Sequence, residues 1–236
     1  MNPEKPDLNR ILAALSVADR TLLRPDLEAV DLPLRYRLAE ANQKISSAFF
    51  IETGMASTTT HVKHQVPIEI GVTGREGVAN LPFIMGSDRA PSETFMQIGG
   101  VGLRIPSEAL RDAMRKSETL TATLLRSTHV FLVQVSSTVL ANGRATISER
   151  LARWLLMARD RVDEDAIGLT HEFLAIMLGV QRPGVTVALR DFERRGLVLG
   201  ARALITILDR EGLETAANGY YGSAESEFQR LFGRAG

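Results

Sequence analysis

The apolar residues in the first half of the chain alternate with polar or small residues. The clearest run spans residues 66–72, Val-Pro-Ile-Glu-Ile-Gly-Val, and shorter runs cover residues 32–38 and 101–105. A period of two is typical of strands that bury one face. Glycines between these runs favour an antiparallel sandwich or barrel. Residues 11–27 have a different spacing and predict one or two short helices packed on this β-unit.

The pattern changes to a helical period in the second half. All prolines except Pro183 lie at or before Pro106, and good helix formers dominate the proline-free segment that follows. Ser107 and Ser117 are expected to be N-caps. The second would begin one helix from Ser117 to about Asn142, roughly 39 Å long at 1.5 Å per residue.

This long helix carries two apolar lines and therefore has two surfaces to bury. One surface can cover the β-unit of the same chain, and the other can pair with the same helix of a second subunit. The expected dimer interface is a weak a/d seam of Leu124, Thr128, Phe131, Val135 and Thr138. The neighbouring line is Leu125, Leu132 and Val139. The alternative is one internal core helix.

Two signals predict a break after the long helix. Asn142-Gly143 is a helix stop, and Thr146-Ile-Ser-Glu149 is a capping box that begins a helix through about Arg161. Residues 142–146 are therefore a candidate hinge. The new helix carries Trp154 on its apolar face, where we expect it to pack in the core. The acidic residues 163–165 indicate a solvated linker.

The strongest functional signal is residues 169–196, LTHEFLAIMLGVQRPGVTVALRDFERRG. Thr170 caps a first helix, small Ala175 allows a second helix to approach closely, and Gly179 permits the left-handed turn between them. Pro183 fits the first turn of the second helix, where its missing N–H costs nothing. This combination predicts a helix-turn-helix.

A short hairpin follows the second helix. Leu197-Val198-Leu199, a turn at Gly200-Ala-Arg202, and Leu204-Ile-Thr-Ile-Leu208 make two strands, so the unit reads as a winged helix. The competing interpretation is an αα-hairpin core with a chance glycine.

The DNA-facing residues follow from the positions that packing leaves free. Arginine can read guanine and glutamine can read adenine, while helix N-termini and the wing tip can hold phosphates. The predicted DNA contacts are Gln181, Arg182, Thr186 and Arg190 on the second helix, Thr170 and His171 before it, and Arg202 in the wing.

Composition narrows the remaining classes of protein. The 236 residues are 44% hydrophobic and balance 28 basic against 28 acidic side chains, so any DNA-binding face must be local. The absence of cysteine excludes disulfides, thiolate zinc sites and cysteine-ligated iron–sulfur clusters, and fits a reducing cytoplasm. No run of about 18 apolar residues and no signal-peptide pattern occurs, so we expect no membrane association.

Neither a metal site nor an active site is predicted. His61 and His64, near Glu69, would point to opposite faces of a strand, since they are three residues apart. No nucleophile elbow, zincin or Walker motif is present, and we expect no enzymatic activity and no cofactor.

The chain resembles the Crp/Fnr superfamily of bacterial transcription regulators over essentially its whole length. The matching segments are GVTGREGVANLPFIMG, ISERLARWLLMARDRV, LTHEFLAIMLGVQRPGVTVAL and ITILDREGLE. The resemblance implies an α+β chain with an antiparallel β-roll, a double-stranded β-helix of the cyclic-nucleotide-binding type, at 1–116. It further implies a dimerisation helix and hinge at 117–145 and a winged helix-turn-helix domain with a C-terminal tail at 146–236.

Departures from the family bear on the ligand and the operator. Members that bind cyclic AMP hold its phosphate with an Arg-Ser pair, whereas here Arg89 is followed by Ala90. The resemblance leaves Arg75, Glu76, Arg89, Val135 and Ser136 as ligand-pocket candidates. In the recognition helix Arg182 matches a base-reading arginine, but Pro183 and Val187 replace an acidic residue and an arginine.

The resulting prediction is a homodimeric, sequence-specific transcription regulator that binds a palindromic operator in double-stranded DNA. Its effector would be something other than cyclic AMP, or it would have none. RNA polymerase and an unidentified small-molecule effector stay open as further partners. The alternative is a β-roll module that binds a small molecule or a protein, with DNA binding secondary or lost.

Overall fold

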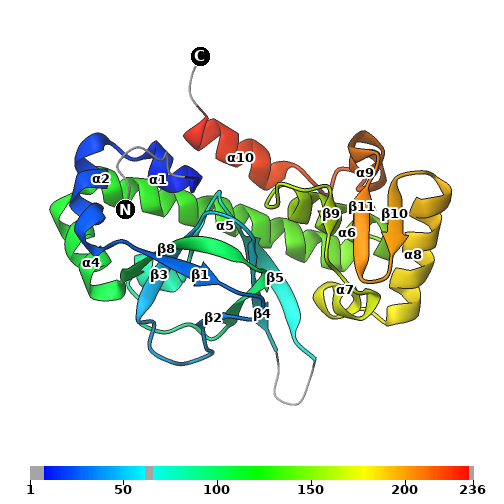
Figure 1. The fold of residues 1–236 in the computed structure, drawn as a ribbon, viewed down its shortest axis with the longest axis horizontal. Coiled ribbons are helices and arrows are strands. Elements are labelled where there is room, and N and C mark those ends of the chain that lie inside the picture. The colour runs from blue at the N-terminus through cyan, green and yellow to red at the C-terminus, as the bar shows by residue number, and fades with distance from the viewer. Residues whose placement is uncertain (1–7, 62–65, 234–236) are drawn as a thin grey trace. The chain divides into compact units, whose positions relative to one another are not determined.

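The computed structural model describes residues 8–61 and 66–233, and the chain divides into two compact units. The first contains the described residues up to Thr58, Val72–Val133 and the residues from Glu225 onward. The second contains Thr59–Gly71, as far as it is described, and Gln134–Ala224. Helix α5 (Glu118–Arg144) contributes to both units (Figure 1).

The β-unit consists of two four-stranded sheets with the orders β1-β8-β3-β6 and β2-β7-β4-β5. The strands are β1 (Glu28–Leu32), β2 (Arg37–Ala39), β3 (Ser47–Ile51), β4 (Met55–Thr60), β5 (Ile68–Thr73), β6 (Val78–Ala79), β7 (Glu93–Ile98) and β8 (Gly100–Pro106). All registered pairs are antiparallel. A buried cluster lies among these strands: Leu32, Leu38, Phe49, Ile51, Ala56, Ala79 and Met96. The predicted antiparallel β-roll is confirmed.

One predicted strand, residues 32–38, is wrong. Strand β1 ends at Leu32, and Arg35 takes a left-handed backbone with φ of 68° before β2 begins. Leu34 and Tyr36 are exposed, so the alternation of apolar residues there accompanies a turn rather than a buried face.

The short helices predicted for residues 11–27 are present in the first unit, and α3 (Leu81–Ile84) is an additional helix that the sequence pattern did not predict. The short helices of this unit are α1 (Arg10–Ala14), α2 (Val17–Leu23), the 3-10 turn η1 (Arg24–Asp26), α3 and α4 (Ser107–Lys116). Asn9 and Ser16 cap α1 and α2 with their side chains. The N-cap prediction for Ser107 is wrong, because Pro106 occupies that position and the Ser107 hydroxyl donates to the Ile45 carbonyl at 3.0 Å.

Helix α5 begins as predicted but continues past the expected stop. The Ser117 hydroxyl accepts from the amide of Leu120 at 3.1 Å, whereas Gly143 stays helical. A glycine costs a helix only about 1 kcal/mol. The end is set by Thr146, whose extended backbone and reciprocal capping with Glu149 begin α6 (Ile147–Arg159).

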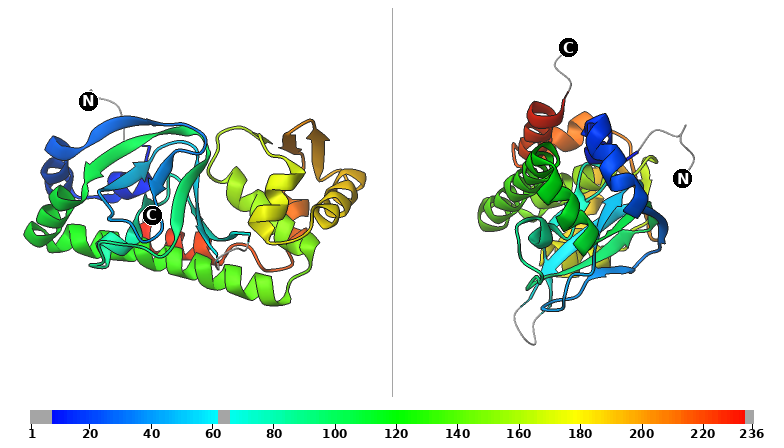
Figure 2. Two further views of the ribbon diagram at one scale, coloured as in Figure 1. Left: turned by 90° about the horizontal axis from the view of Figure 1, so that it is seen from below. Right: turned by 90° about the vertical axis from the view of Figure 1, so that its left-hand side faces the viewer.

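The two sides of α5 differ sharply in exposure. Leu120, Leu124 and Ala141 are buried in their own chain. A neighbouring side carries an exposed apolar row, defined here as Leu125, Leu132 and Val139, with exposures of 46%, 51% and 67%. These residues repeat every seven positions, which is the spacing of a coiled-coil seam. Figure 2 shows α5 as one uninterrupted helix.

The second unit holds α6, α7 (His171–Leu178), α8 (Arg182–Arg194), α9 (Arg210–Ala216) and a sheet of the order β10-β11-β9. Its strands are β9 (Ala166–Ile167), β10 (Val198–Ala201) and β11 (Leu204–Ile207). Trp154 is buried, as predicted, and its ring N–H donates to the Glu69 carboxylate at 2.7 Å. The Glu69 carboxylate, which lies near His61 and His64 in the sequence, therefore already accepts a hydrogen bond from Trp154. His64 lies outside the described residues.

The C-terminal tail contains two helices that the sequence pattern did not predict. After α9, helix α10 (Ser223–Phe232) joins the first unit, where Glu227 accepts from His129 of α5 at 2.8 Å. Hydrogen bonds from Arg230 and His129 lower the pKa of Glu227 to about 2 against the opposing effect of desolvation. Arg10 of α1 lies over the Phe228 ring at 5.9 Å.

One described helix, α5, has the length and apolar content of a membrane span. Helices α7 and α8 meet the same test only as a pair, and they are bent by 111°. The apolar content of α5 has another physical explanation, since a helix with one buried side and one exposed apolar row has the same composition as a membrane span.

A buried carboxylate anchors the start of α5. Asp19 of α2 is 3% exposed and accepts from the hydroxyls of Ser16, Ser117 and Thr119, the last at 2.7 Å. Burial by itself would raise the pKa of Asp19, but the three hydrogen bonds outweigh it and hold the pKa below its ordinary value.

We expect Asp19→Asn to lower the free energy of unfolding by roughly 1–3 kcal/mol at pH 7, because the amide cannot accept all three hydroxyls. Since the folded pKa is depressed, the wild-type advantage is present above the unfolded pKa of about 4 and is lost as pH falls below it. Urea unfolding between pH 3 and pH 7 measures both effects. Exposed Asp31→Asn is the control, and equal losses in the two variants would contradict the assignment.

Candidate nucleic-acid interface

Helices α7 and α8 form a helix-turn-helix. Their axes are bent by 111°, within the range expected for this motif. Gly179 takes the left-handed backbone at the corner with φ of 60°, and the amide of Val180 donates to the Ala175 carbonyl at 2.9 Å. The predicted turn is confirmed, including the roles of Ala175 as a small buried contact and of Gly179 as the corner.

The inner sides of both helices are packed as predicted. Leu174, Ala175 and Leu178 of α7 are buried, as are Val185, Ala188, Leu189 and Phe192 of α8. Helix α6 supports the motif through Arg150, whose guanidinium donates to the Leu178 carbonyl at the end of α7. Desolvation lowers the pKa of Arg150.

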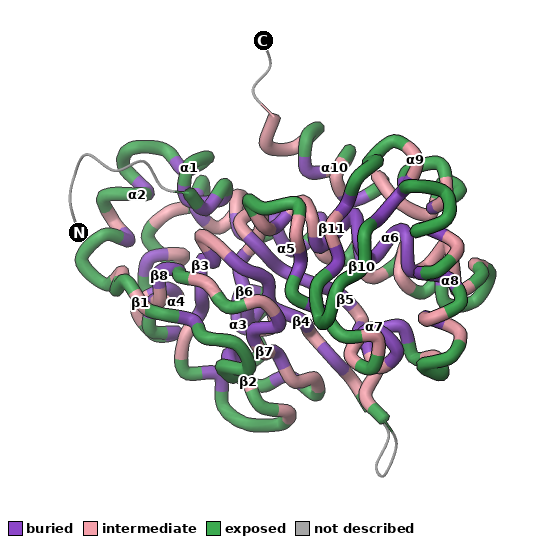
Figure 3. The backbone as a smooth tube through the Cα atoms, turned by 45° about the vertical axis from the view of Figure 1, so that its right-hand side comes forward, coloured by how far each residue is buried: buried purple, intermediate pink, exposed green. Residues whose placement is uncertain are grey.

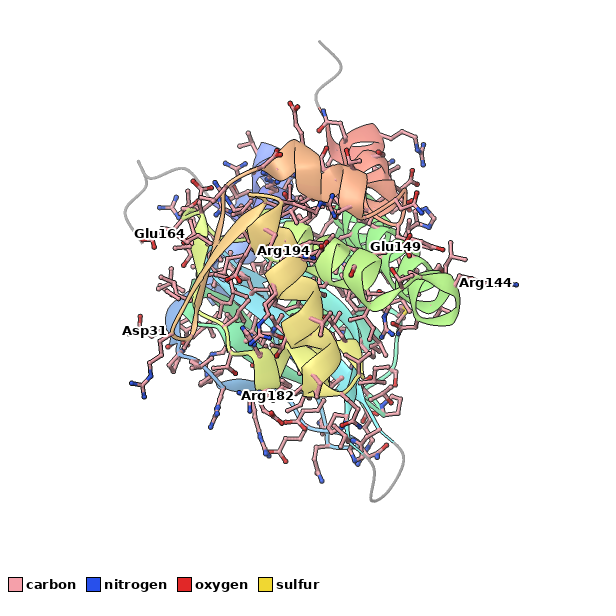
Figure 4. The ribbon with its side chains drawn as sticks, turned by 90° about the vertical axis from the view of Figure 1, so that its right-hand side faces the viewer. Asp31, Arg144, Glu149, Glu164, Arg182 and Arg194 are labelled. Carbon is pink, nitrogen blue, oxygen red and sulfur yellow. The ribbon has the colours of Figure 1, made fainter. Side chains whose placement is uncertain are left out.

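The outer side of α8 presents side chains from both ends of the helix (Figure 4). Arg182 in the first turn and Arg190 two turns later are exposed, and Thr186 between them is half-buried. Gln181 is the N-cap of α8 and is exposed, but its side chain makes no capping bond. Figure 3 shows buried and exposed positions interleaved along α8, as a helix with one packed side requires.

The start of α7 joins this surface. The Thr170 hydroxyl accepts from the amide of Phe173 at 3.2 Å, which confirms it as the N-cap. A ring nitrogen of His171 lies 3.1 Å from the Thr186 hydroxyl, so α7 and α8 are linked beside the exposed face. The remaining first-turn amides of α7 have no intrahelical acceptor and suit an anion such as phosphate.

The wing is present, but its turn is shifted from the predicted position. Strand β10 continues through Ala201, and the two-residue turn is Arg202-Ala203, where Ala203 has φ of 57°. Gly200 is part of the strand, and its amide donates to the Glu193 carboxylate at 3.1 Å. Arg202 is exposed at the turn, in the position expected of a phosphate contact.

The ligand-pocket candidates remain a prediction. In the first unit, Glu76 accepts from the amide of Gly74, and Arg89 is exposed and donates to the Asn42 carbonyl at 2.9 Å. Arg75 is half-buried, and its carbonyl accepts from the amide of Arg10 at 2.7 Å. Val135 is half-buried and Ser136 exposed on α5, in the portion that belongs to the second unit.

Two of the five residues of the predicted dimer seam are buried by their own chain, and the seam as an interface stays a prediction. Leu124 and Thr128 are buried, and Phe131, Val135 and Thr138 are half-buried. The Thr128 hydroxyl donates to the Leu124 carbonyl within the helix. Burial by the same chain removes Leu124 and Thr128 from any outer surface, whereas the exposed apolar row stays accessible to a second chain.

Comparison with known proteins agrees with this geometry. Residues 149–216 match the Crp-like helix-turn-helix domain. The HTH-type transcriptional regulator Cmr of Mycobacterium tuberculosis is 40% identical over 58 residues, which are 25% of this chain and 24% of that protein. The match to this curated relative thus spans about a quarter of its length.

Two solved structures share the fold over most of the chain. A transcriptional regulator of the Crp/Fnr family from Eubacterium rectale has a TM-score of 0.68 and 22% identity, covering 87% of this chain and 96% of that one. FixK2 from Bradyrhizobium japonicum has a TM-score of 0.69 and 15% identity, covering 80% and 96%. The chain therefore carries a Crp-like helix-turn-helix domain on the fold of Crp/Fnr regulators, and the resemblance is confirmed.

One acidic side chain competes for the predicted base reader. Glu172 of α7 lies 3.9 Å from Arg182, with both side chains about two-thirds exposed. An exposed pair is worth about 0.2–1 kcal/mol. We expect Glu172→Gln to raise operator affinity up to about fivefold per half-site by releasing Arg182, as measured by fluorescence anisotropy. In an Arg182→Ala background the gain should vanish, and a gain of the same size there would contradict the pairing.

Proposed function

We propose that this chain is a sequence-specific, DNA-binding transcription regulator that acts as a homodimer in the cytoplasm. The observation that carries the proposal is the α7–α8 helix-turn-helix, which packs its apolar residues inward and leaves Arg182 and Arg190 exposed on the outer side of α8. A recognition helix needs this division, because the groove accepts one free face while the other holds the helix in place.

The base-reading surface is the first two turns of α8, with Gln181, Arg182 and Thr186. Arginine can bond guanine with two donors, and Thr186 is held in place by His171. We expect Thr170, His171, Arg190 and Arg202 to contact phosphates, which fix register without carrying sequence information.

Dimerisation through the exposed apolar row of α5 completes the proposal. Three aliphatic side chains at heptad spacing are exposed on one helix, and a second copy of α5 would bury them. Two copies related by a two-fold axis present two α8 helices, so the operator is a palindrome with half-sites about 34–36 Å apart.

The β-roll is the proposed sensor, with an effector other than cyclic AMP or none. The residue after Arg89 is Ala90, which is 6% exposed and has no polar side chain to offer a phosphate. A second candidate function is a β-roll binding module with weak DNA affinity, in which the surface of α8 would carry no sequence preference.

We expect Arg182→Ala to weaken operator binding and to relax the sequence preference at the base that Arg182 reads, since one bidentate contact is worth about 1–3 kcal/mol per half-site. Selection from genomic DNA fragments by purified wild type should return a palindrome whose binding weakens with salt. Arg194→Ala, which removes an exposed arginine paired with Asp191 at 2.7 Å, is the matched control and should keep the preference. Weak, sequence-blind binding by wild type that Arg182→Ala leaves unchanged would favour the binding-module alternative.

We expect Leu132→Glu to convert dimers into monomers, because it places two carboxylates in the centre of the proposed contact. Sedimentation velocity measures the change, and operator affinity should fall at least tenfold, since one half-site is then bound alone. The matched control is Leu34→Glu in the β1–β2 turn, where Leu34 is 62% exposed. A dimer that survives Leu132→Glu would place the interface elsewhere.

A further inference from the structure

The outer side of α8 carries one strongly exposed aliphatic side chain. Val187 is 68% exposed in the second turn of the helix, whereas Val185, two positions earlier, is completely buried. Packing within the chain therefore explains why an apolar side chain stands at Val185, but it does not explain the apolar side chain of Val187. Arg182 and Arg190 lie on either side of Val187 along the same exposed surface.

Helix formation does not account for Val187 either. A β-branched residue is a weaker helix former than the lysine, glutamate or alanine that an exposed helix position normally accepts. Pro183 lies one turn before Val187 and is also exposed, so the two form an apolar strip on a face otherwise marked by arginines. Such a strip gains free energy only when another apolar group covers it.

The major groove offers one apolar group to a side chain. Among the base edges exposed there, the C5-methyl of thymine is hydrophobic, and the others are hydrogen-bond donors and acceptors. Valine can neither donate nor accept a hydrogen bond, so it can discriminate bases only through such a methyl group.

We propose that Val187 is a specificity-determining residue that reads the C5-methyl of a thymine in each half-site of the operator. The inference rests on the proposed function and adds one element of the operator sequence to it. Because the dimer is symmetric, the thymine occurs at the same distance from the centre in both half-sites. Cytosine at that position lacks the methyl group and is discriminated against.

The test replaces thymines of the selected operator by deoxyuridine, one symmetric pair at a time. This change removes the methyl group and keeps every hydrogen-bonding atom. With wild-type protein, deoxyuridine at one symmetric pair of thymines should weaken binding about fourfold per half-site, and roughly fifteenfold for both half-sites together. A factor of about four is what the burial of one methyl-sized group contributes. With Val187→Ala, the same pair should change binding less than twofold.

The control variant is Val17→Ala, which shortens an 83% exposed valine on α2 and should behave as wild type toward every deoxyuridine operator. Thermal unfolding of Val187→Ala should match wild type, since alanine is the better helix former. A wild type that is insensitive at every thymine, or a Val187→Ala variant equally sensitive at the same pair, overturns this inference alone. Failure to select any sequence-specific site overturns the proposed function together with it.

Discussion

The structure depends on how one long helix, α5, buries its two apolar sides. Helix α5 runs from Glu118 to Arg144 without interruption and belongs to both compact units. Its inner side is completed by its own chain at Leu120 and Leu124, whereas the exposed apolar row is left open. A helix that is apolar on both sides requires a second surface, and the repeat of seven makes an identical helix the simplest one. Under the proposed function, the same helix sets the distance between the two recognition helices of a dimer.

Within the second unit, a buried arginine holds α6 against the last turns of α5. Arg153 of α6 is 6% exposed and donates to the Gln134 carbonyl, the Thr138 hydroxyl and the Tyr220 carbonyl at 3.1 to 3.3 Å. A buried guanidinium is tolerated because several acceptors satisfy it. Only Ala145 and Thr146 separate α5 from α6. Bending at the proposed hinge would therefore strain or break the hydrogen bonds of Arg153. These hydrogen bonds thus oppose bending between α5 and α6.

The sequence predicted best where a feature depends on local chemistry. The turn of the helix-turn-helix was predictable because Gly179, Thr170 and Pro183 each satisfy a requirement of their own backbone position. Prediction failed where tertiary context decides. Helix α5 continues through Gly143, because Thr146 ends it more strongly. Strand β9 has two residues and exists through its pairing with β11, and helix α10 is held by contacts with α1 and α5 that periodicity does not reveal. Which apolar line of α5 faces outward was likewise beyond the sequence, because neighbouring lines differ by one position.

The charge distribution explains why recognition must come from a few side chains. The chain has no net charge, so it lacks the broad electrostatic attraction that dominates non-specific binding. At the end of α8, Asp191 pairs with Arg194 and Arg195 at 2.7 and 3.5 Å, so its carboxylate offsets part of the charge of two exposed cations. Among the described residues, no ion pair involves Arg190 or Arg202. The cations left for phosphates are thus sparse, and discrimination between sites has to come from base edges. Under these conditions an apolar contact worth a factor of four in each half-site is a substantial part of specificity rather than a minor addition to it.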